Sequence, residues 1–89
     1  MEVTFQVSIY PVAQKEFKKQ IDGFISDLKN DKIKIHVHET STIGGSEIKT
    51  AFDSIRKAYS RACKSGPTVM VLTVVNEHPS SEELKALND

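Results

Sequence analysis

Two stretches of the chain alternate between apolar and polar residues, the pattern of a β-strand with one buried face. The first stretch covers residues 3–10 and ends at Pro11. Its apolar positions are Val3, Phe5, Val7 and Ile9. The second stretch covers residues 33–38, with apolar positions at Ile33, Ile35 and Val37. A tight turn near Thr40 should then lead into a short third strand that ends at Gly45.

Two other stretches carry apolar residues at intervals of three and four, which is typical of amphipathic helices. In residues 15–30 the apolar positions are Phe17, Ile21, Phe24, Ile25 and Leu28. The second helix should begin after Ser46, whose hydroxyl can cap it, with Glu47 complementing the helix dipole. Its expected inner face consists of Ile48, Ala51, Phe52, Ile55, Ala58, Tyr59, Ala62 and Cys63. Gly66 and Pro67 end this helix and lead into the last strand.

The last strand, residues 68–76, is apolar at both odd and even positions, so both of its faces need covering. One small layer of helices can cover only one of them. The side expected to meet the helices comprises Val69, Val71 and Val75. The side expected to contact another subunit comprises Met70, Leu72 and Val74.

The order strand, helix, strand, strand, helix, strand is typical of the ferredoxin-like α+β fold, βαββαβ. We therefore predict one ferredoxin-like domain over residues 1–78, a four-stranded antiparallel sheet with two helices on one face. Right-handed crossovers place the first and third strands in the centre and the other two at the edges. Residues 79–89 form a polar C-terminal tail, in which Ser80 and Glu83 have the spacing of a capping box for a short helix.

Composition narrows the classes of partner. Twelve basic and twelve acidic residues cancel in a chain of 89, so no net charge attracts nucleic acid or an anionic membrane. The single cysteine, Cys63, excludes an internal disulfide framework and suits a reducing compartment. The chain starts with an alternating strand pattern and not with a basic region and a long apolar stretch, so we expect a cytoplasmic protein. So small a domain would gain stability from oligomerising.

Three short segments stand out by their joint order and spacing: residues 7–11 (VSIYP), residues 41–45 (STIGG) and residues 66–71 (GPTVMV) followed by Asn76. Together they resemble the thiamine-binding, YkoF-like family of small ferredoxin-like proteins, over about residues 2 to 78. The resemblance implies a ferredoxin-like fold and oligomers built through sheet packing. For some members it also implies binding of thiamine or its hydroxymethylpyrimidine part. The Gly44–Gly45 pair and the tail after Pro79 depart from the family's pattern.

The candidate ligand-binding residues are polar and lie at or near strand ends: Tyr10, Ser41, Thr42 and Asn76. Polar groups there can converge on a pocket without disrupting the core. A pyrimidine needs donors and acceptors for its amino group and ring nitrogens, with an aromatic surface for stacking. Glu39 is the candidate that would favour the cationic thiazolium ring of thiamine. The alternative is that these residues are ordinary turn formers and that Glu39 is a solvated charge.

His36 and His38 are two apart on a strand and therefore share one face. With His78 they could in principle hold a metal, but no Cys or carboxylate spacing completes a known site, and we predict neither a metal nor a cofactor. We place the histidine pair on the open sheet face, at the oligomer interface, where protonation would weaken assembly. Gly44 and Gly45 before a helix could present amides to an anion, although a simple turn explains them better.

No residue pattern supports catalysis. Order and spacing suggest no paired-carboxylate, Ser-His-Asp or Cys-His arrangement, and the loop 11–15 lacks the arginine of an acylphosphatase. We therefore expect a non-enzymatic protein that binds thiamine or a related pyrimidine and forms a homodimer or homotetramer through its sheet face. The alternative is a structural or regulatory interaction module without a small-molecule ligand. RNA binding would need several exposed aromatics on the central strands and a basic surround, whereas Tyr10 is the only aromatic predicted on the open face and the net charge is zero.

Overall fold

The computed structural model describes residues 1–31, 33–38 and 41–77. Its elements are β1 (Glu2–Pro11), α1 (Phe17–Asn30), β2 (Lys34–Val37), β3 (Thr42–Glu47), α2 (Ile48–Ala62), a short 3₁₀ helix (Cys63–Ser65) and β4 (Thr68–Val75). The strands form one sheet in the order β2-β3-β1-β4, and every neighbouring pair is antiparallel. The predicted ferredoxin-like fold is therefore confirmed, with β1 and β3 in the centre.

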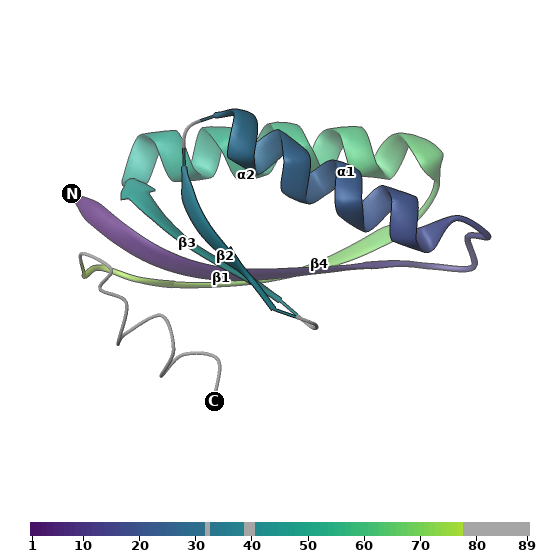
Figure 1. The fold of residues 1–89 in the computed structure, drawn as a ribbon, viewed down its shortest axis with the longest axis horizontal. Helices are drawn as coiled ribbons and strands as arrows, with labels where there is room; N and C mark the ends of the chain where they lie inside the picture. Colours follow the sequence, from purple (N-terminus) through teal and green to yellow (C-terminus); the bar gives the residue numbers. More distant parts are fainter. Residues whose placement is uncertain (32, 39–40, 78–89) are drawn as a thin grey trace.

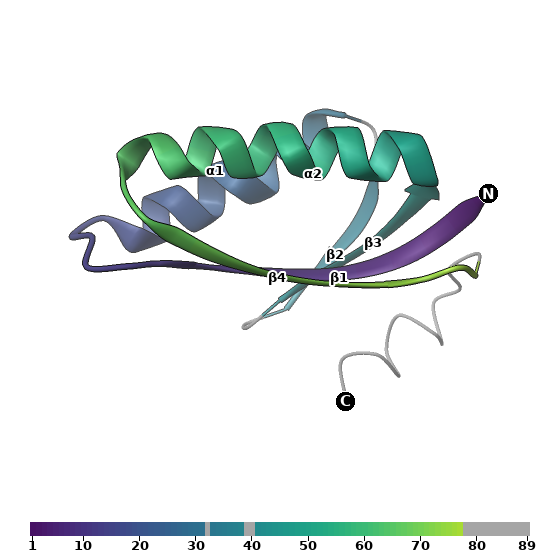
Figure 2. The same cartoon turned by 180° about the vertical axis from the view of Figure 1, so that it is seen from behind.

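Both helices lie on the same side of the sheet, as the two opposite views in Figures 1 and 2 show. The core lies between these two layers. The residues that form it are Val3, Phe5, Val7 and Ile9 from β1, Phe24 and Leu28 from α1, Ile33, and Ala51, Ile55, Ala58 and Ala62 from α2. The small alanines of α2 let this helix approach the sheet and α1 closely. No helix in the described ranges is long and apolar enough to cross a bilayer.

Two phenylalanines predicted on the inner helix faces are exposed instead. Phe17 is 57% exposed at the first residue of α1, and Phe52 is 45% exposed on α2. Ser54, which has no apolar signal, is 2% exposed and takes a place in the buried face. The buried stripe of α2 therefore runs through positions 51, 54, 55, 58 and 62, which leaves Phe52 on the flank of the helix.

The pairing of β4 with β1 shows that the predicted faces of the last strand are interchanged. Leu72 lies opposite Val7, whose side chain is buried beneath the helices, and Leu72 packs against the same core. Val71 lies opposite Ser8 on the other face and is 52% exposed. The even-numbered residues Met70, Leu72 and Val74 thus share the helix side with Ile9, Val7 and Phe5. Because side chains alternate with a period of two, register decides the face, and an all-apolar strand carries no signal for register.

The junction between β3 and α2 also differs from the prediction. The strand β3 continues to Glu47 and does not end at Gly45. The side chain of Glu47, and not that of Ser46, caps α2: its Oε2 accepts hydrogen bonds from the amides of Lys49 at 2.7 Å and Thr50 at 3.4 Å. Gly45 lies inside the sheet, between strands on both sides. The glycine pair is therefore part of a central strand and not an anion-binding loop.

Candidate functional site

Beside the end of β1 the sheet has a notch, because β3 is shorter than β1. The pairing of β1 with β3 ends at Val7 opposite Thr42, whereas its pairing with β4 continues to Pro11 opposite Thr68. The β1 segment 8–10 therefore has β4 on one side and the notch on the other. Side chains from α1 cover the notch from the helix side of the sheet.

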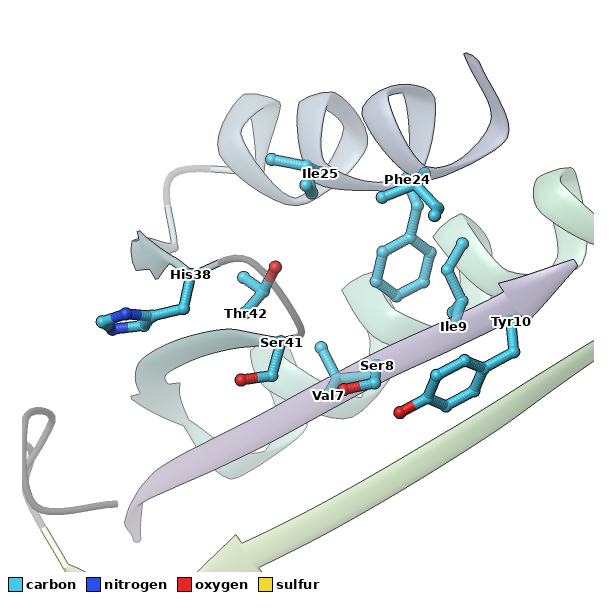
Figure 3. A pocket seen from close by; sticks show the side chains of 10 residues that line it. Val7, Ser8, Ile9, Tyr10, Phe24, Ile25, His38, Ser41 and Thr42 are labelled. Atoms are coloured by element: carbon cyan, nitrogen blue, oxygen red, sulfur yellow. The ribbon is translucent and has the colours of Figure 1, made fainter. Parts of the chain in front are cut away.

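The notch contains a cavity of about 230 Å³. The apolar part of its wall consists of Val7 and Ile9 from β1 and Ile21, Phe24 and Ile25 from α1. The polar part consists of Ser8, Tyr10, His38, Ser41 and Thr42. In Figure 3, Phe24 reaches down from α1 toward β1, with Ser8 and Ser41 on the lower side of the cavity. An apolar cleft with a few polar groups is the usual form of a small-molecule site.

Two hydrogen bonds hold Ser41 in place at the edge of this cavity. Its hydroxyl oxygen accepts a bond from Gln6 Nε2 at 3.2 Å, and its carbonyl oxygen accepts one from the amide of His38 at 2.8 Å. Ser41 is 7% exposed, and its neighbour Thr42 is 4% exposed. A polar side chain fixed in this way loses little freedom when a ligand binds.

Tyr10 is the aromatic residue of the polar wall and is half exposed. Its ring lies back along β1, with the hydroxyl on the side of Ser8 (Figure 3). On the helix-free face of the sheet, Tyr10, Ser8 and Ser41 also line a second hollow of about 250 Å³. Gln6, Val71 and Thr73 complete that hollow. The same three residues thus border both spaces, so a ligand with two ring systems could occupy adjoining hollows.

The imidazole rings of His36 and His38 lie side by side, with centroids 4.8 Å apart, which confirms their predicted common face. His38 also lines the cavity, and its Nε2 is buried without a hydrogen-bond partner among the described residues. His78 lies outside the described residues. In the described ranges no three His, Cys, Asp or Glu side chains are grouped to hold a metal ion. His38 therefore adds a polar group to a cavity that was predicted without it.

Asn76 does not join this site, and the prediction that it lies near Tyr10 is wrong. The strands β1 and β4 are antiparallel, so the end of β4 lies beside the start of β1. Val75 is opposite Thr4, whereas Val69 is opposite Tyr10. Seven strand positions therefore separate Asn76 from Tyr10, which is roughly 23 Å. Tyr10, Ser41 and Thr42 do converge, because β3 begins where the antiparallel β1 ends.

Several residues of the site were not predicted as site residues. Ser8 lies two positions from Tyr10 on the same strand, and this spacing alone puts both on one face. Ile21, Phe24 and Ile25 of α1 also line the cavity, but their helical spacing in the sequence predicted only that they belong to the core. Glu39, the predicted partner of a thiazolium ring, lies outside the described residues. The described lining of the cavity contains no carboxylate, so it offers aromatic, hydroxyl and imidazole groups to a ligand.

Solved structures with the same fold include three small proteins of low sequence identity. A protein from Thermotoga maritima, assigned as a candidate to thiamine biosynthesis or salvage, aligns over 100% of both chains with a TM-score of 0.83 and 16% identity. A hypothetical protein from Methanocaldococcus jannascii aligns over 98% of this chain and 96% of its own, with a TM-score of 0.84 and 19% identity. A domain of unknown function from Bacillus cereus aligns over 93% and 86%, with a TM-score of 0.79 and 16% identity. At these identities the likeness shows the fold alone.

The sequence itself matches a family pattern over most of its length. No curated protein sequence matches the chain. The pattern that defines the YKOF-related family matches residues 2–81, a range that includes all four strands and both helices. The resemblance carried by residues 7–11, 41–45 and 66–76 is thereby confirmed. The chain belongs to the YkoF-related family.

Proposed function

We propose that this protein is a non-enzymatic binding protein whose notch holds thiamine or its hydroxymethylpyrimidine part. The observation that carries the proposal is the convergence of Tyr10, near the end of β1, with Ser41 and Thr42, at the start of β3, on one cavity beneath α1. Membership of the YkoF-related family and the fold shared with the Thermotoga maritima protein support this class of ligand.

The cavity suits a small aromatic heterocycle. A flat ring can pack against Phe24 and Ile25, while the hydroxyl groups of Ser41 and Tyr10 can each donate or accept a hydrogen bond. Pockets for drug-sized ligands have volumes of about 300–1,000 Å³. A cavity of about 230 Å³ therefore suits one ring, such as the pyrimidine, better than all of thiamine. The adjoining hollow of about 250 Å³ offers room for the second ring.

The same proposal includes assembly of the protein through the helix-free face of its sheet. The register of β4 moves the candidate contact surface to Val69 and Val71, which lie opposite Tyr10 and Ser8. Both valines are half exposed. Apolar side chains gathered on an uncovered sheet face favour packing against a second sheet. A subunit packed there would also close the second hollow over Tyr10 and Ser8.

An interaction module without a small-molecule ligand is the alternative function. The observation that favours it is the same exposed pair, Val69 and Val71, which another protein could cover as well as a second copy could. In that case the notch would bind no pyrimidine. The two functions therefore differ in the outcome of one titration.

Isothermal titration calorimetry with thiamine, hydroxymethylpyrimidine and thiamine phosphates tests the ligand. We expect saturable heat with thiamine or hydroxymethylpyrimidine. The Tyr10→Ala variant should bind about tenfold more weakly, equivalent to about 1.4 kcal/mol. Asn76→Ala is the matched control, because that residue lies at the opposite end of the sheet, and its affinity should equal that of the wild type. Correctly folded protein that gives no heat with any of these compounds would refute the ligand proposal and favour the interaction module.

Multi-angle light scattering tests assembly through the open face. The Val71→Asp variant should have a lower mass than the wild type, because a carboxylate buried between two sheets would lack a partner. Val12→Asp is the control, since Val12 is also exposed but follows the end of β1. A wild-type protein that is a strict monomer at micromolar concentration would contradict this part of the proposal.

A further inference from the structure

Part of the helix-free face of the sheet is deeply buried, although both helices lie on the other side (Figures 1 and 2). Ile43 of β3 is 0% exposed, yet it does not belong to the core between the sheet and the helices. It lies opposite Gln6, which alternates with the core residues Phe5 and Val7, so Ile43 and Gln6 share the helix-free face. Thr4, two positions before Gln6 on the same face, is 2% exposed. Ile43 and Thr4 together define the covered patch.

The neighbours of these two residues in the sheet do not explain their burial. Side chains on one face of a sheet stand side by side, so their outer ends reach solvent unless another layer covers them. Tyr10 and Val71 lie on the same face and are half exposed. A second layer must therefore cover Ile43 and Thr4 but not Tyr10 and Val71.

The described chain ends beside the covered patch. After β4 ends at Val75, the hydroxyl of Thr4 donates a hydrogen bond to the carbonyl oxygen of Glu77 at 2.9 Å. The backbone at Glu77 has therefore reached a side chain of the helix-free face. Residues 78–89 follow and lie outside the described ranges. Even a compact helix of that length would extend about 18 Å, whereas the patch extends over two strand positions, or about 7 Å.

The other residues outside the described ranges are too few to form this layer. Residue 32 lies in the connection between α1 and β2, and residues 39–40 lie in the connection between β2 and β3. Ile43 is near the start of β3, but Thr4 is opposite Gly45, further along that strand. Two residues at the turn cannot cover both positions. Residues 78–89 remain.

The sequence of residues 78–89 suits an apolar patch. Its large apolar residues are Leu84 and Leu87, and most of the others are polar or charged. Two residues three apart share one face of a helix, and the capping-box spacing of Ser80 and Glu83 predicts a helix that begins just before Leu84. One face of such a helix is apolar and the other is polar. The apolar face complements Ile43.

We propose that residues 78–89 of the same chain fold back over the covered patch and form a second layer on this half of the sheet, with Leu84 and Leu87 against Ile43. The hydrogen bond between Thr4 and Glu77 holds the start of the segment at the patch. A segment attached by so short a connection acts at an effective concentration of the order of millimolar, so a few apolar contacts are enough to hold it.

The covered patch is separate from the contact surface proposed for assembly and does not depend on the proposed ligand. Val71 lies opposite Ser8, four positions along β1 from Thr4. A second subunit against Val71 and the C-terminal segment over the patch can therefore be present together. Gln6 lies between the two areas and lines the second hollow, so the segment would border that hollow on one side.

Thiol labelling of the full chain tests the proposal. In a Cys63→Ser background, the thiol of Ile43→Cys should react slowly with a water-soluble aromatic disulfide, whereas that of Val71→Cys should react quickly. Adding Leu84→Asp and Leu87→Asp should raise the rate for Ile43→Cys by about tenfold or more, because a carboxylate without a partner does not stay against an apolar patch. Lys85→Asp is the matched control, since it puts the same charge at a polar position, and it should leave the rate unchanged.

The dependence on protein concentration identifies the source of the cover. The rate for Ile43→Cys should be the same at every concentration, because the patch and its cover belong to one chain. A rate that decreases as concentration rises would show that a second copy covers the patch and would overturn the proposal. An unchanged rate after Leu84→Asp and Leu87→Asp would also overturn it.

Amide hydrogen exchange of the wild type is a second measurement that needs no substitution in the sheet. We expect protected amides within residues 80–89 and the same protection at every concentration. Leu84→Asp with Leu87→Asp should remove this protection, and Lys85→Asp should retain it. Fast exchange throughout residues 80–89 in the wild type would overturn the proposal.

Discussion

The aromatic ring of Phe5 lies against Gly44, its cross-strand neighbour in the sheet. A Cβ added at position 44 would lie 2.7 Å from Cζ of Phe5 and 2.9 Å from the carbonyl oxygen of Lys34. Phe5 is 1% exposed, so its ring is enclosed in the core and cannot move out into solvent. Gly44 is thus the residue that makes room for the largest side chain of β1 in the core.

We predict that Gly44→Ala lowers the free energy of unfolding by about 1–3 kcal/mol, the usual cost of overpacking a core. Chemical denaturation measures this change. Gly23→Ala is the control, since a Cβ at that helical position would meet no described atom within 4 Å. This second variant should be more stable by about 0.5–1 kcal/mol, because alanine favours a helix over glycine. Equal stability of Gly44→Ala and the wild type would contradict the proposed packing.

Glu47→Ala should destabilise the protein by about 0.5–2 kcal/mol, the usual cost of losing a helix cap. The side chain of Glu47 accepts hydrogen bonds from the amides of Lys49 and Thr50, and alanine leaves both without this partner. Thermal and urea denaturation measure the loss. Ser46→Ala should change stability by less than about 0.5 kcal/mol, because Ser46 is outside the cap. A larger effect at Ser46 than at Glu47 would restore the assignment made from sequence.

Tyr59→Phe should cost about 1 kcal/mol of stability or more, because it removes the hydrogen bonds of the Tyr59 hydroxyl. The hydroxyl of Tyr59 donates to the carbonyl oxygen of Thr68 at 2.7 Å and so ties α2 to the start of β4. The hydrogen bond with Cys63, together with burial, raises the pKa of Tyr59 above its ordinary value of 10.0. The folded state therefore holds this proton more tightly, and stability decreases as pH rises from 10.0 through the folded-state pKa.

Denaturation of the wild type and Tyr59→Phe at several alkaline pH values separates this group from the lysines. The wild type should lose stability more steeply than the variant. Parallel curves would show that Tyr59 titrates alike in the folded and unfolded states.

Asp53 contributes to stability above its ordinary pKa of 3.8 and should lose that contribution in acid. Its carboxylate accepts a hydrogen bond from Lys49 Nζ at 2.6 Å, and this bond with the charge of Lys49 lowers the pKa of Asp53. The contribution is therefore lost as pH falls through the folded-state pKa. The same contact raises the pKa of Lys49 above 10.5, so the contribution of Lys49 to stability is lost only as pH rises beyond that value.

The comparison of the wild type with Asp53→Asn tests this contact. We expect a small difference in stability at neutral pH, because both groups are exposed and water screens them. The difference should disappear in strong acid and decrease at high salt. A difference that persists at about pH 2 would assign the effect to helix propensity and not to the ion pair.

The order of the elements followed from local patterns. The alternation in residues 3–10 and the helical spacing in residues 15–30 each depend on a backbone geometry that acts within a few residues. The crossover rule then placed β1 and β3 in the centre. The β3–α2 junction was predicted less well, because both Ser46 and Glu47 are suitable caps and only the backbone path decides which one reaches the free amides.

Part of the candidate site was predicted correctly, and the direction of the strands explains which part. Ser41 and Tyr10 meet because β3 starts beside the end of β1, and Asn76 is excluded because β4 ends beside the start of β1. Both relations follow from antiparallel pairing, which the predicted topology already contained. The cavity itself could not be predicted from the sequence. Its wall depends on how far β1 extends past β3 and on which α1 side chains turn toward the notch.

By itself the sequence determined the type, order and approximate bounds of the elements and the fold they form, because hydrophobic periodicity is a local property that survives without tertiary context. The tertiary structure decided which face of β4 meets the helices, since a strand that is apolar on both sides can be buried either way until its pairing with Val7 and Ile9 sets the register. That register puts Met70 and Leu72 beside α2 and leaves Val69 and Val71 on the open face.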